Sequence, residues 1–125
     1  MIRAATFDTG ALIALERHSA RMNGVLLRLA EDRLAVTVPA VVLAEWWRSG
    51  NDRARRRLLE QMIVEPTTRA IAQLAGEAAG QVGATGIDAI VMASAAQRGD
   101  VVYTSDFDDL DRLRQVFPQV VVLRA

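Results

Sequence analysis

Residues 2–7, IRAATF, followed directly by Asp8-Thr9, decide how the rest of the chain is interpreted. The six residues form a short apolar run typical of a buried strand. From Asp8 onward a helical pattern begins, with Leu12 and Leu15 on one side of the predicted helix. The predicted strand therefore ends in a carboxylate that lies at the start of a helix.

The same alternation of strand and helix continues to the end of the chain. Further strands are predicted at 34–38, 62–65, 101–103 and 119–123. Helices are predicted at 19–33, 39–48, 53–61, 69–81 and 87–98, and from the acidic turn after Asp106 to about residue 117. Ser19, Asp52 and Thr68 are expected to cap their helices, and Pro39 is suited to a first turn. Short apolar strands separated by helices predict a three-layer α/β/α sandwich with a short, mostly parallel central sheet.

Composition limits the chemistry that this chain can perform. A length of 125 residues with 51% hydrophobic content fits one domain, residues 1–125. We expect a cytoplasmic protein, because no membrane span or signal peptide is evident. The chain has no cysteine and only His18, to which we assign no role, so a thiolate or zinc site is excluded. All 15 basic residues are arginine, which excludes a P-loop or Schiff-base lysine. Any metal must be held by oxygen, which favours Mg²⁺, Mn²⁺ or Ca²⁺.

Four acids are candidates for such a site: Asp8, Glu45, Asp88 and Asp106. Asp8 and Asp106 lie at the carboxyl ends of predicted strands. In open parallel sheets, ligands bind just beyond these ends. Asp88 begins a helix that is apolar nearly all round, and Glu45 lies beside an apolar helix face. The ordinary interpretation is that the aspartates cap helices and the glutamate is solvated. Against it, unpaired buried carboxylates cost roughly several kcal/mol each, and nearby segments offer no cation for Asp8 or Asp88. A divalent ion removes that cost.

The acids and their neighbours resemble the PIN domains, and in particular the toxin ribonucleases of VapBC toxin–antitoxin pairs. The resemblance covers the whole chain. Its motifs are a strand ending in Asp8-Thr9, Pro39 followed by Glu45, the segment 86–95 (GIDAIVMASA) around Asp88, and the segment 102–110 (VYTSDFDDL) around Asp106. No single motif is specific, and the specificity lies in the four acids in this order.

The resemblance implies that the four acids are the catalytic metal ligands, directly or through water, with Thr9, Thr104 and Asp109 as supporting groups. It further implies an endoribonuclease that uses Mg²⁺ or Mn²⁺ to orient or deprotonate a water, with RNA as substrate and a small cognate antitoxin as partner. Gly10 departs from the family pattern, since many relatives carry Asn or Ser there.

Other features suggest contacts with macromolecules. Arg48 and the run of Arg53, Arg55, Arg56 and Arg57 are suited to RNA phosphates, although such a run could also bind an acidic partner or pair with Glu60. Of Trp46 and Trp47, one is expected in the core and the other is free to stack on a base or fill an antitoxin groove. Gly76 and Gly80 permit close helix packing, from which we expect a homodimer.

Three alternatives stay open at this point. A PIN nuclease could process RNA without an antitoxin. A Mg²⁺-dependent phosphohydrolase of small phosphate esters, of the haloacid-dehalogenase kind, usually opens with Asp-x-Asp and uses a lysine; the segment Asp8-Thr9-Gly10 lacks the second acid and the chain lacks lysine. A non-catalytic RNA-binding or scaffold module would usually have lost one of the acids, and none is missing.

Overall fold

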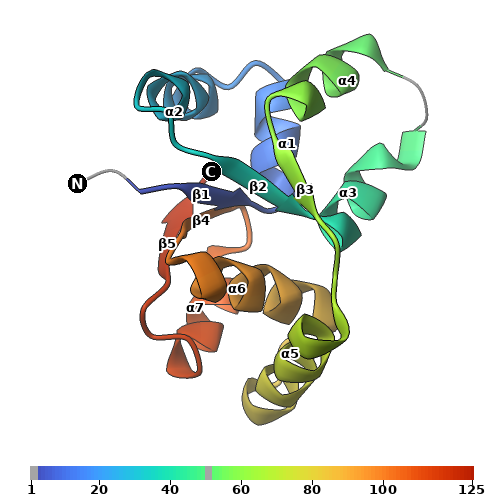
Figure 1. The fold of residues 1–125 in the computed structure, drawn as a ribbon, viewed down its shortest axis with the longest axis vertical. Coiled ribbons are helices and arrows are strands. Elements are labelled where there is room, and N and C mark those ends of the chain that lie inside the picture. The colour runs from blue at the N-terminus through green and yellow to red at the C-terminus, as the bar shows by residue number, and fades with distance from the viewer. Residues whose placement is uncertain (1–2, 50–51) are drawn as a thin grey trace.

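The computed structural model describes residues 3–49 and 52–125 (Figure 1). Its centre is a five-stranded sheet in the order β3-β2-β1-β4-β5. The strands are β1 (Ala5–Phe7), β2 (Val36–Pro39), β3 (Ile63–Glu65), β4 (Val101–Thr104) and β5 (Val121–Arg124). Within the described residues, all neighbouring strands pair in parallel. The predicted α/β fold is thereby confirmed.

Helices cover both faces of this sheet. Along the chain they are α1 (Thr9–Glu16), α2 (Ala20–Glu31), α3 (Ala40–Trp46), the 3₁₀ turn η1 (Trp47–Ser49), α4 (Arg53–Glu60), α5 (Arg69–Val82), α6 (Gly86–Arg98), α7 (Phe107–Arg112) and the 3₁₀ turn η2 (Leu113–Gln115). In Figure 1, α1, α2 and α4 lie above the sheet, whereas α5, α6 and α7 lie below it. The sandwich therefore has the three layers that the sequence predicts.

Local side-chain hydrogen bonds set where several helices begin. Ser19, Asp52 and Thr68 each accept a hydrogen bond from a backbone N–H in the first turn of the helix that follows, as predicted. Thr85 does the same for α6, which begins at Gly86, one residue before the predicted start. Gly83 ends α5 in the left-handed conformation, with φ of 70°, which glycine adopts without steric cost.

Several element boundaries differ from the sequence-based expectation by a few residues, among them both ends of α3. Pro39 is the last residue of β2 and the cap of α3, with ψ of 142°, rather than the first residue of the helix. Its fixed φ is compatible with both positions, and pairing with Glu65 of β3 keeps it in the sheet. The helix predicted at 39–48 is α-helical only to Trp46 and continues as η1. Residues 50 and 51, between the helices predicted at 39–48 and 53–61, lie outside the described residues.

The strand order creates one position suited to a ligand. From the central strand β1 the chain moves to β2 and β3 on one side of the sheet, and later returns to β4 and β5 on the other. The order therefore reverses between β1 and β4, and in open parallel sheets ligands bind beyond the carboxyl ends of such strands. Asp8 follows β1 and Asp106 follows β4.

The core that fixes these strands is built from the sheet and α6. Phe7, Met92, Val102 and Leu110 are fully buried, and Phe7 packs edge-on against Tyr103, with ring centroids 5.7 Å apart. A run of residues in α6, from Val91 to Ala95, is also fully buried, as its apolar sequence predicts. In the part of the chain that the structure describes, no helix is both long and apolar enough to cross a membrane.

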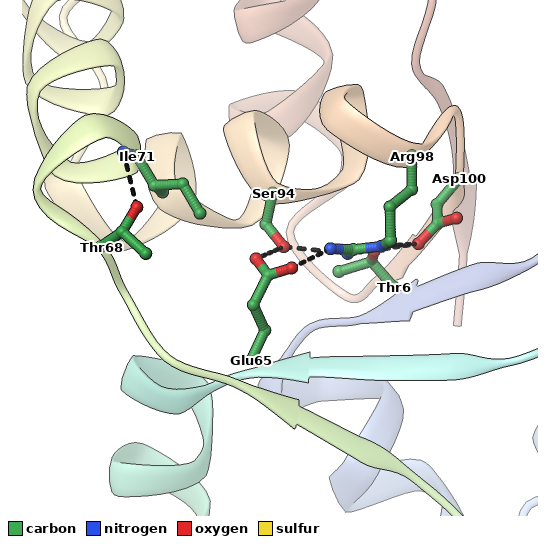
Figure 2. A network of polar contacts seen from close by, with 7 residues as sticks. All are labelled: Thr6, Glu65, Thr68, Ile71, Ser94, Arg98 and Asp100. Atoms are coloured by element: carbon green, nitrogen blue, oxygen red, sulfur yellow. Dashed lines mark hydrogen bonds and ion pairs between the residues drawn. The ribbon is translucent and has the colours of Figure 1, made fainter.

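A polar network ties the carboxyl end of α6 to the sheet (Figure 2). Asp100, which is 1% exposed, accepts hydrogen bonds from the Thr6 hydroxyl (2.8 Å) and from Nε of Arg98 (2.9 Å). The same guanidinium donates to Glu65 of β3 and to the Ser94 hydroxyl, which in turn donates to Glu65 (2.7 Å). Two buried or half-buried carboxylates therefore share one arginine. This network is not evident from the sequence, because Thr6, Glu65 and Arg98 are far apart along the chain.

Arg98→Met should destabilise the protein by roughly 2–4 kcal/mol, because it leaves the Asp100 carboxylate buried without its cation. The side chain of Arg98 is 28% exposed, so the cost should fall short of that at a fully buried pair. Arg28→Met is the matched control, since Arg28 pairs with Asp32 at the surface and should cost less than about 1 kcal/mol. Urea unfolding measures both, and equal losses would show that the network adds nothing.

Candidate metal centre

Asp8 is held in place by both strands at the position where the strand order reverses. Its side chain is buried, with the residue 3% exposed. Oδ1 accepts a hydrogen bond from the backbone N–H of Thr9 (2.8 Å), which makes Asp8 the cap of α1. Oδ2 accepts one from the Thr104 hydroxyl of β4 (2.8 Å), and the Asp8 backbone N–H donates to the carbonyl of Tyr103 (3.1 Å). Asp8 thus both caps a helix and turns toward β4.

The Thr104 hydroxyl connects Asp8 to Asp106. It donates its proton to Asp8 and accepts a hydrogen bond from the backbone N–H of Asp106 (2.9 Å). Thr104 is fully buried, so this hydroxyl has a fixed environment. Asp106 itself precedes α7 but makes no capping hydrogen bond with its side chain. The ordinary capping interpretation therefore does not account for the Asp106 carboxylate, which is exposed to the pocket.

Asp88 reaches the pocket of Asp8 and Asp106 from α6, which lies below the sheet in Figure 1. It lies in the first turn of α6, where its backbone N–H donates to the Thr85 hydroxyl (3.1 Å). Thr85 is therefore the cap of this helix, and the partly buried Asp88 carboxylate is not needed for that purpose. Val91, Met92 and Ala95, which follow Asp88 by three, four and seven positions and so share its side of α6, are fully buried.

The three aspartates Asp8, Asp88 and Asp106 meet in one pocket of about 430 Å³. One carboxylate oxygen from each lies within 4.8 Å of the others. The described residues that line the pocket include no arginine or histidine: they are Asp8, Thr9, Gly10, Ile13, Glu45, Thr85, Ile87, Asp88, Ser105, Asp106 and Asp109. A set of carboxylate oxygens with no cation among them fits a hard divalent ion such as Mg²⁺ or Mn²⁺.

Glu45 and Asp109 lie at the border of this group. Glu45 of α3 lines the pocket, but its carboxylate is not one of the three that converge within 4.8 Å. Instead its Oε1 accepts a hydrogen bond from the Thr9 hydroxyl (2.6 Å), which ties α3 to α1. Asp109 lines the pocket and pairs with Arg112 at the surface (2.9 Å). Six of the seven sequence-predicted residues thus line one pocket, and three of these lie closest together. The seventh, Thr104, is fully buried and donates a hydrogen bond to Asp8.

Crowding and burial shift the acidity of the innermost groups. Burial is the main cause of the raised pKa of Asp8, opposed by hydrogen bonds from Thr104 and Thr9 and reinforced by the charges of Asp106 and Glu45. Burial, followed by the charge of Asp8, raises the pKa of Asp88 to about 6. Both groups would lose their protons more readily if a divalent cation occupied the pocket.

Gly10 is required by a close approach that the sequence could not reveal. A Cβ atom at this position would lie 2.0 Å from Oγ of Ser105 and 2.8 Å from the backbone nitrogen of Ser105. Rotation of the serine side chain would relieve the first contact but not the second. Ser105 therefore explains why residue 10 departs from the family pattern. The Ser105 side chain occupies the space that the Cβ atom of any larger residue at position 10 would need.

The arginine run predicted to contact RNA divides in the structure. Arg55 turns inward, where its Nε pairs with Oε2 of Glu16 (2.7 Å) and its guanidinium lies over the ring of Trp46 (5.8 Å). The other members of the run are exposed on α4: Arg53, Arg56 and Arg57. Trp46 is buried, which confirms that one tryptophan belongs to the core, and Trp47 is partly exposed. His18 is exposed beyond the end of α1 and takes part in none of these contacts.

The metal-free protein should become more stable as the pH falls from about 7 to about 5.5. The reason is that Asp8 and Asp88 have folded pKa values above their ordinary value, so the folded state binds more protons than the unfolded state over this range. Asp88→Asn should raise the metal-free melting temperature and flatten this pH dependence. Thermal unfolding in EDTA measures both effects. A lower melting temperature for Asp88→Asn, with unchanged pH dependence, would identify Asp88 as a structural residue.

Gly10→Ala should destabilise the protein by roughly 1–3 kcal/mol, because the backbone of Ser105 has to move away from the new methyl group. That movement displaces the neighbouring Asp106, so stabilisation by added Mn²⁺ should also decrease. Gly24→Ala is the control: Gly24 lies in α2 with open space around it, and alanine there should stabilise the helix by up to about 1 kcal/mol. If both variants behave alike, the close approach is not a constraint.

Solved structures of other proteins share this fold. Three solved structures of similar fold are toxin–antitoxin complexes. A chain of VapBC2 from Rickettsia felis, bound to a promoter DNA fragment, is 15% identical with a TM-score of 0.75, covering 100% of this chain and 99% of that chain. A chain of a toxin–antitoxin complex from Klebsiella pneumoniae is 18% identical with a TM-score of 0.74, covering 94% and 96%. A chain of DNA-bound VapBC from Salmonella typhimurium is 14% identical with a TM-score of 0.73, covering 99% and 98%.

At these identities the structural likeness concerns the fold. No curated protein matches the chain in sequence. The family model described as PIN domain matches residues 5–116, which include all four acids and every strand but β5. On that match, the chain belongs to the PIN domain family.

Proposed function

We propose that this protein is a metal-dependent endoribonuclease, the toxin of a type II toxin–antitoxin pair. The observation that carries the proposal is the convergence of Asp8, Asp88 and Asp106 within 4.8 Å, in a pocket without a cationic side chain among its described residues. Keeping partly desolvated carboxylates together is costly without a compensating charge. A structural role alone gives no reason to accept that cost.

In this proposal the three aspartates hold Mg²⁺ or Mn²⁺, and Glu45 takes part directly or through a water. A bound divalent ion would lower the pKa of a water and offset the charge that develops on the phosphate. Thr104 orients the Asp8 carboxylate, and Thr9 orients Glu45. Asp109, at the edge of the pocket, adds negative charge that supports ion binding. No protein nucleophile is required, which suits a chain without cysteine.

The proposed partners are supported by the structural neighbours. The complexes from Rickettsia felis, Klebsiella pneumoniae and Salmonella typhimurium each contain a toxin with its antitoxin. We therefore propose that this chain, acting as a single nuclease domain in the cytoplasm, binds RNA and a small antitoxin and forms a homodimer. Gly76 and Gly80 lie on the exposed side of α5 with open space around them, which suits a helix contact between two copies. Phosphate contacts by Arg53, Arg56 and Arg57 stay a prediction.

Asp8→Asn and Asp106→Asn should each abolish metal-dependent RNA cleavage while the protein remains folded, because each removes a ligand charge with almost no change in volume. The measurement is incubation of purified protein with total RNA in Mg²⁺, Mn²⁺ or EDTA, with mapping of the new 5′ and 3′ ends. Asp32→Asn is the matched control: Asp32 pairs with Arg28 on the surface of α2 and should leave cleavage unchanged.

The outcomes of these experiments distinguish the proposal from its alternatives. Cleavage that persists in EDTA, or in either active-site variant, would exclude the metal centre. Hydrolysis of small phosphate esters without cleavage of RNA would favour the phosphohydrolase alternative. Growth arrest on expression of the wild-type chain, relieved by Asp8→Asn and by co-expression of a short cognate gene encoded immediately upstream, would support the toxin assignment. Cleavage without such relief would favour a PIN nuclease that acts without an antitoxin.

A further inference from the structure

A second pocket adjoins the acidic one along α1. It has a volume of about 360 Å³ and shares Ile13 and Glu45 with the acidic pocket, so the two pockets adjoin at these residues. The remaining lining residues are Glu16, Arg17, Trp46, Arg48 and Arg55. We call this second pocket the arginine groove. Three of its seven lining residues are arginines and two are glutamates, so its charge is opposite in sign to that of the acidic pocket.

One of the two acids that line the arginine groove is paired with an arginine. Glu16 pairs with Nε of Arg55 (2.7 Å) and accepts a hydrogen bond from the indole N–H of Trp46 (3.1 Å). Oε1 of Glu45 accepts a hydrogen bond from the Thr9 hydroxyl, on the side of the acidic pocket. Arg17 and Arg48 are exposed and form no ion pair with any described residue. These two guanidinium groups are therefore the available positive charge of the groove.

We infer that the arginine groove binds an RNA phosphate that flanks the scissile one, with Arg17 and Arg48 as its ligands; this inference rests on the proposed function. RNA carries a charge on every nucleotide, so a strand whose scissile phosphate lies in the acidic pocket must place neighbouring phosphates close by. Five carboxylates around that pocket repel them: Asp8, Glu45, Asp88, Asp106 and Asp109. A cationic groove in continuity with the pocket lets the strand lie across both.

The guanidinium group is suited to this role because its planar set of donors can hold two phosphate oxygens at once. Arg55 has a different task. Its side chain is only 13% exposed, and its contacts with Glu16 and Trp46 fix α4 against α1 and α3. Arg55 is thus a positioning residue that forms the wall of the groove. An acidic protein segment would also suit two arginines, but continuity with the acidic pocket favours a ligand that spans both.

The double variant Arg17→Gln/Arg48→Gln tests this inference. Its affinity for a short single-stranded oligoribonucleotide, measured by fluorescence anisotropy in the Asp8→Asn background to prevent cleavage, should fall about tenfold near physiological salt. The slope of log affinity against log salt should decrease by about 1.4, which corresponds to two lost phosphate contacts on a single strand. With Asp8 restored, KM for cleavage should rise while kcat stays within about twofold, because the contact is made equally in ground and transition states.

The matched control is Arg28→Gln/Arg69→Gln, which removes the same charge from α2 and from the start of α5. Equal salt slopes for the two double variants would overturn the inference. The inference would also be overturned if Arg17→Gln/Arg48→Gln lost binding to poly-glutamate while its affinity for RNA stayed unchanged. That result would assign the groove to an acidic protein segment. Failure of the proposed function is separate: it would appear as wild-type protein that does not cleave RNA in Mg²⁺ or Mn²⁺, whatever the arginine variants do to binding.

Discussion

Burial of the Asp8 carboxylate between two parallel strands, with no arginine or histidine among the described residues of its pocket, is the constraint on which this structure depends. A charged group in that position needs hydrogen bonds, and the chain supplies them from the N–H of Thr9 and the hydroxyl of Thr104. The same Thr104 oxygen accepts the N–H of Asp106. One short network therefore joins the start of α1 to the loop after β4 and fixes the direction of the site.

The acidic side chains at the two ends of α6 differ in whether a cation balances their charge. At its carboxyl end, Glu65 and Asp100 share Arg98, and the charges are balanced within the protein. At its amino end, Asp88 faces Asp8 and Asp106 without a cation, and its pKa is raised to about 6. Since this fold can bring an arginine to buried acids in one place, the unbalanced acids at the other indicate a site kept open for a positive ligand. Stability is given up locally at a functional position.

The space around the acids is controlled by small residues as much as by charge. Gly10 allows the backbone of Ser105 to approach α1 closely, which places Asp106 beside Asp8. Nearby, Arg55 contacts Glu16 and Trp46, and these three residues line the adjoining arginine groove. The resulting surface is an acidic pocket that continues into a cationic groove, an arrangement suited to a polyanion with one reactive phosphate.

The order of strands and helices, most helix caps and the identity of the candidate acids could be predicted from the sequence, because they depend on local patterns. Hydrophobic periodicity is set within a few residues, and caps such as Ser19 and Asp52 act on the next turn. The position of Asp8 and Asp106 after strands could be inferred in the same way. Only the tertiary structure decided which acids come closest, because that depends on β1 and β4 being neighbours, and on α6 passing beneath them. It also decided the inward turn of Arg55, the Arg98 network and the need for glycine at residue 10, since each joins residues more than 30 positions apart. No local pattern in a single sequence specifies such long-range contacts.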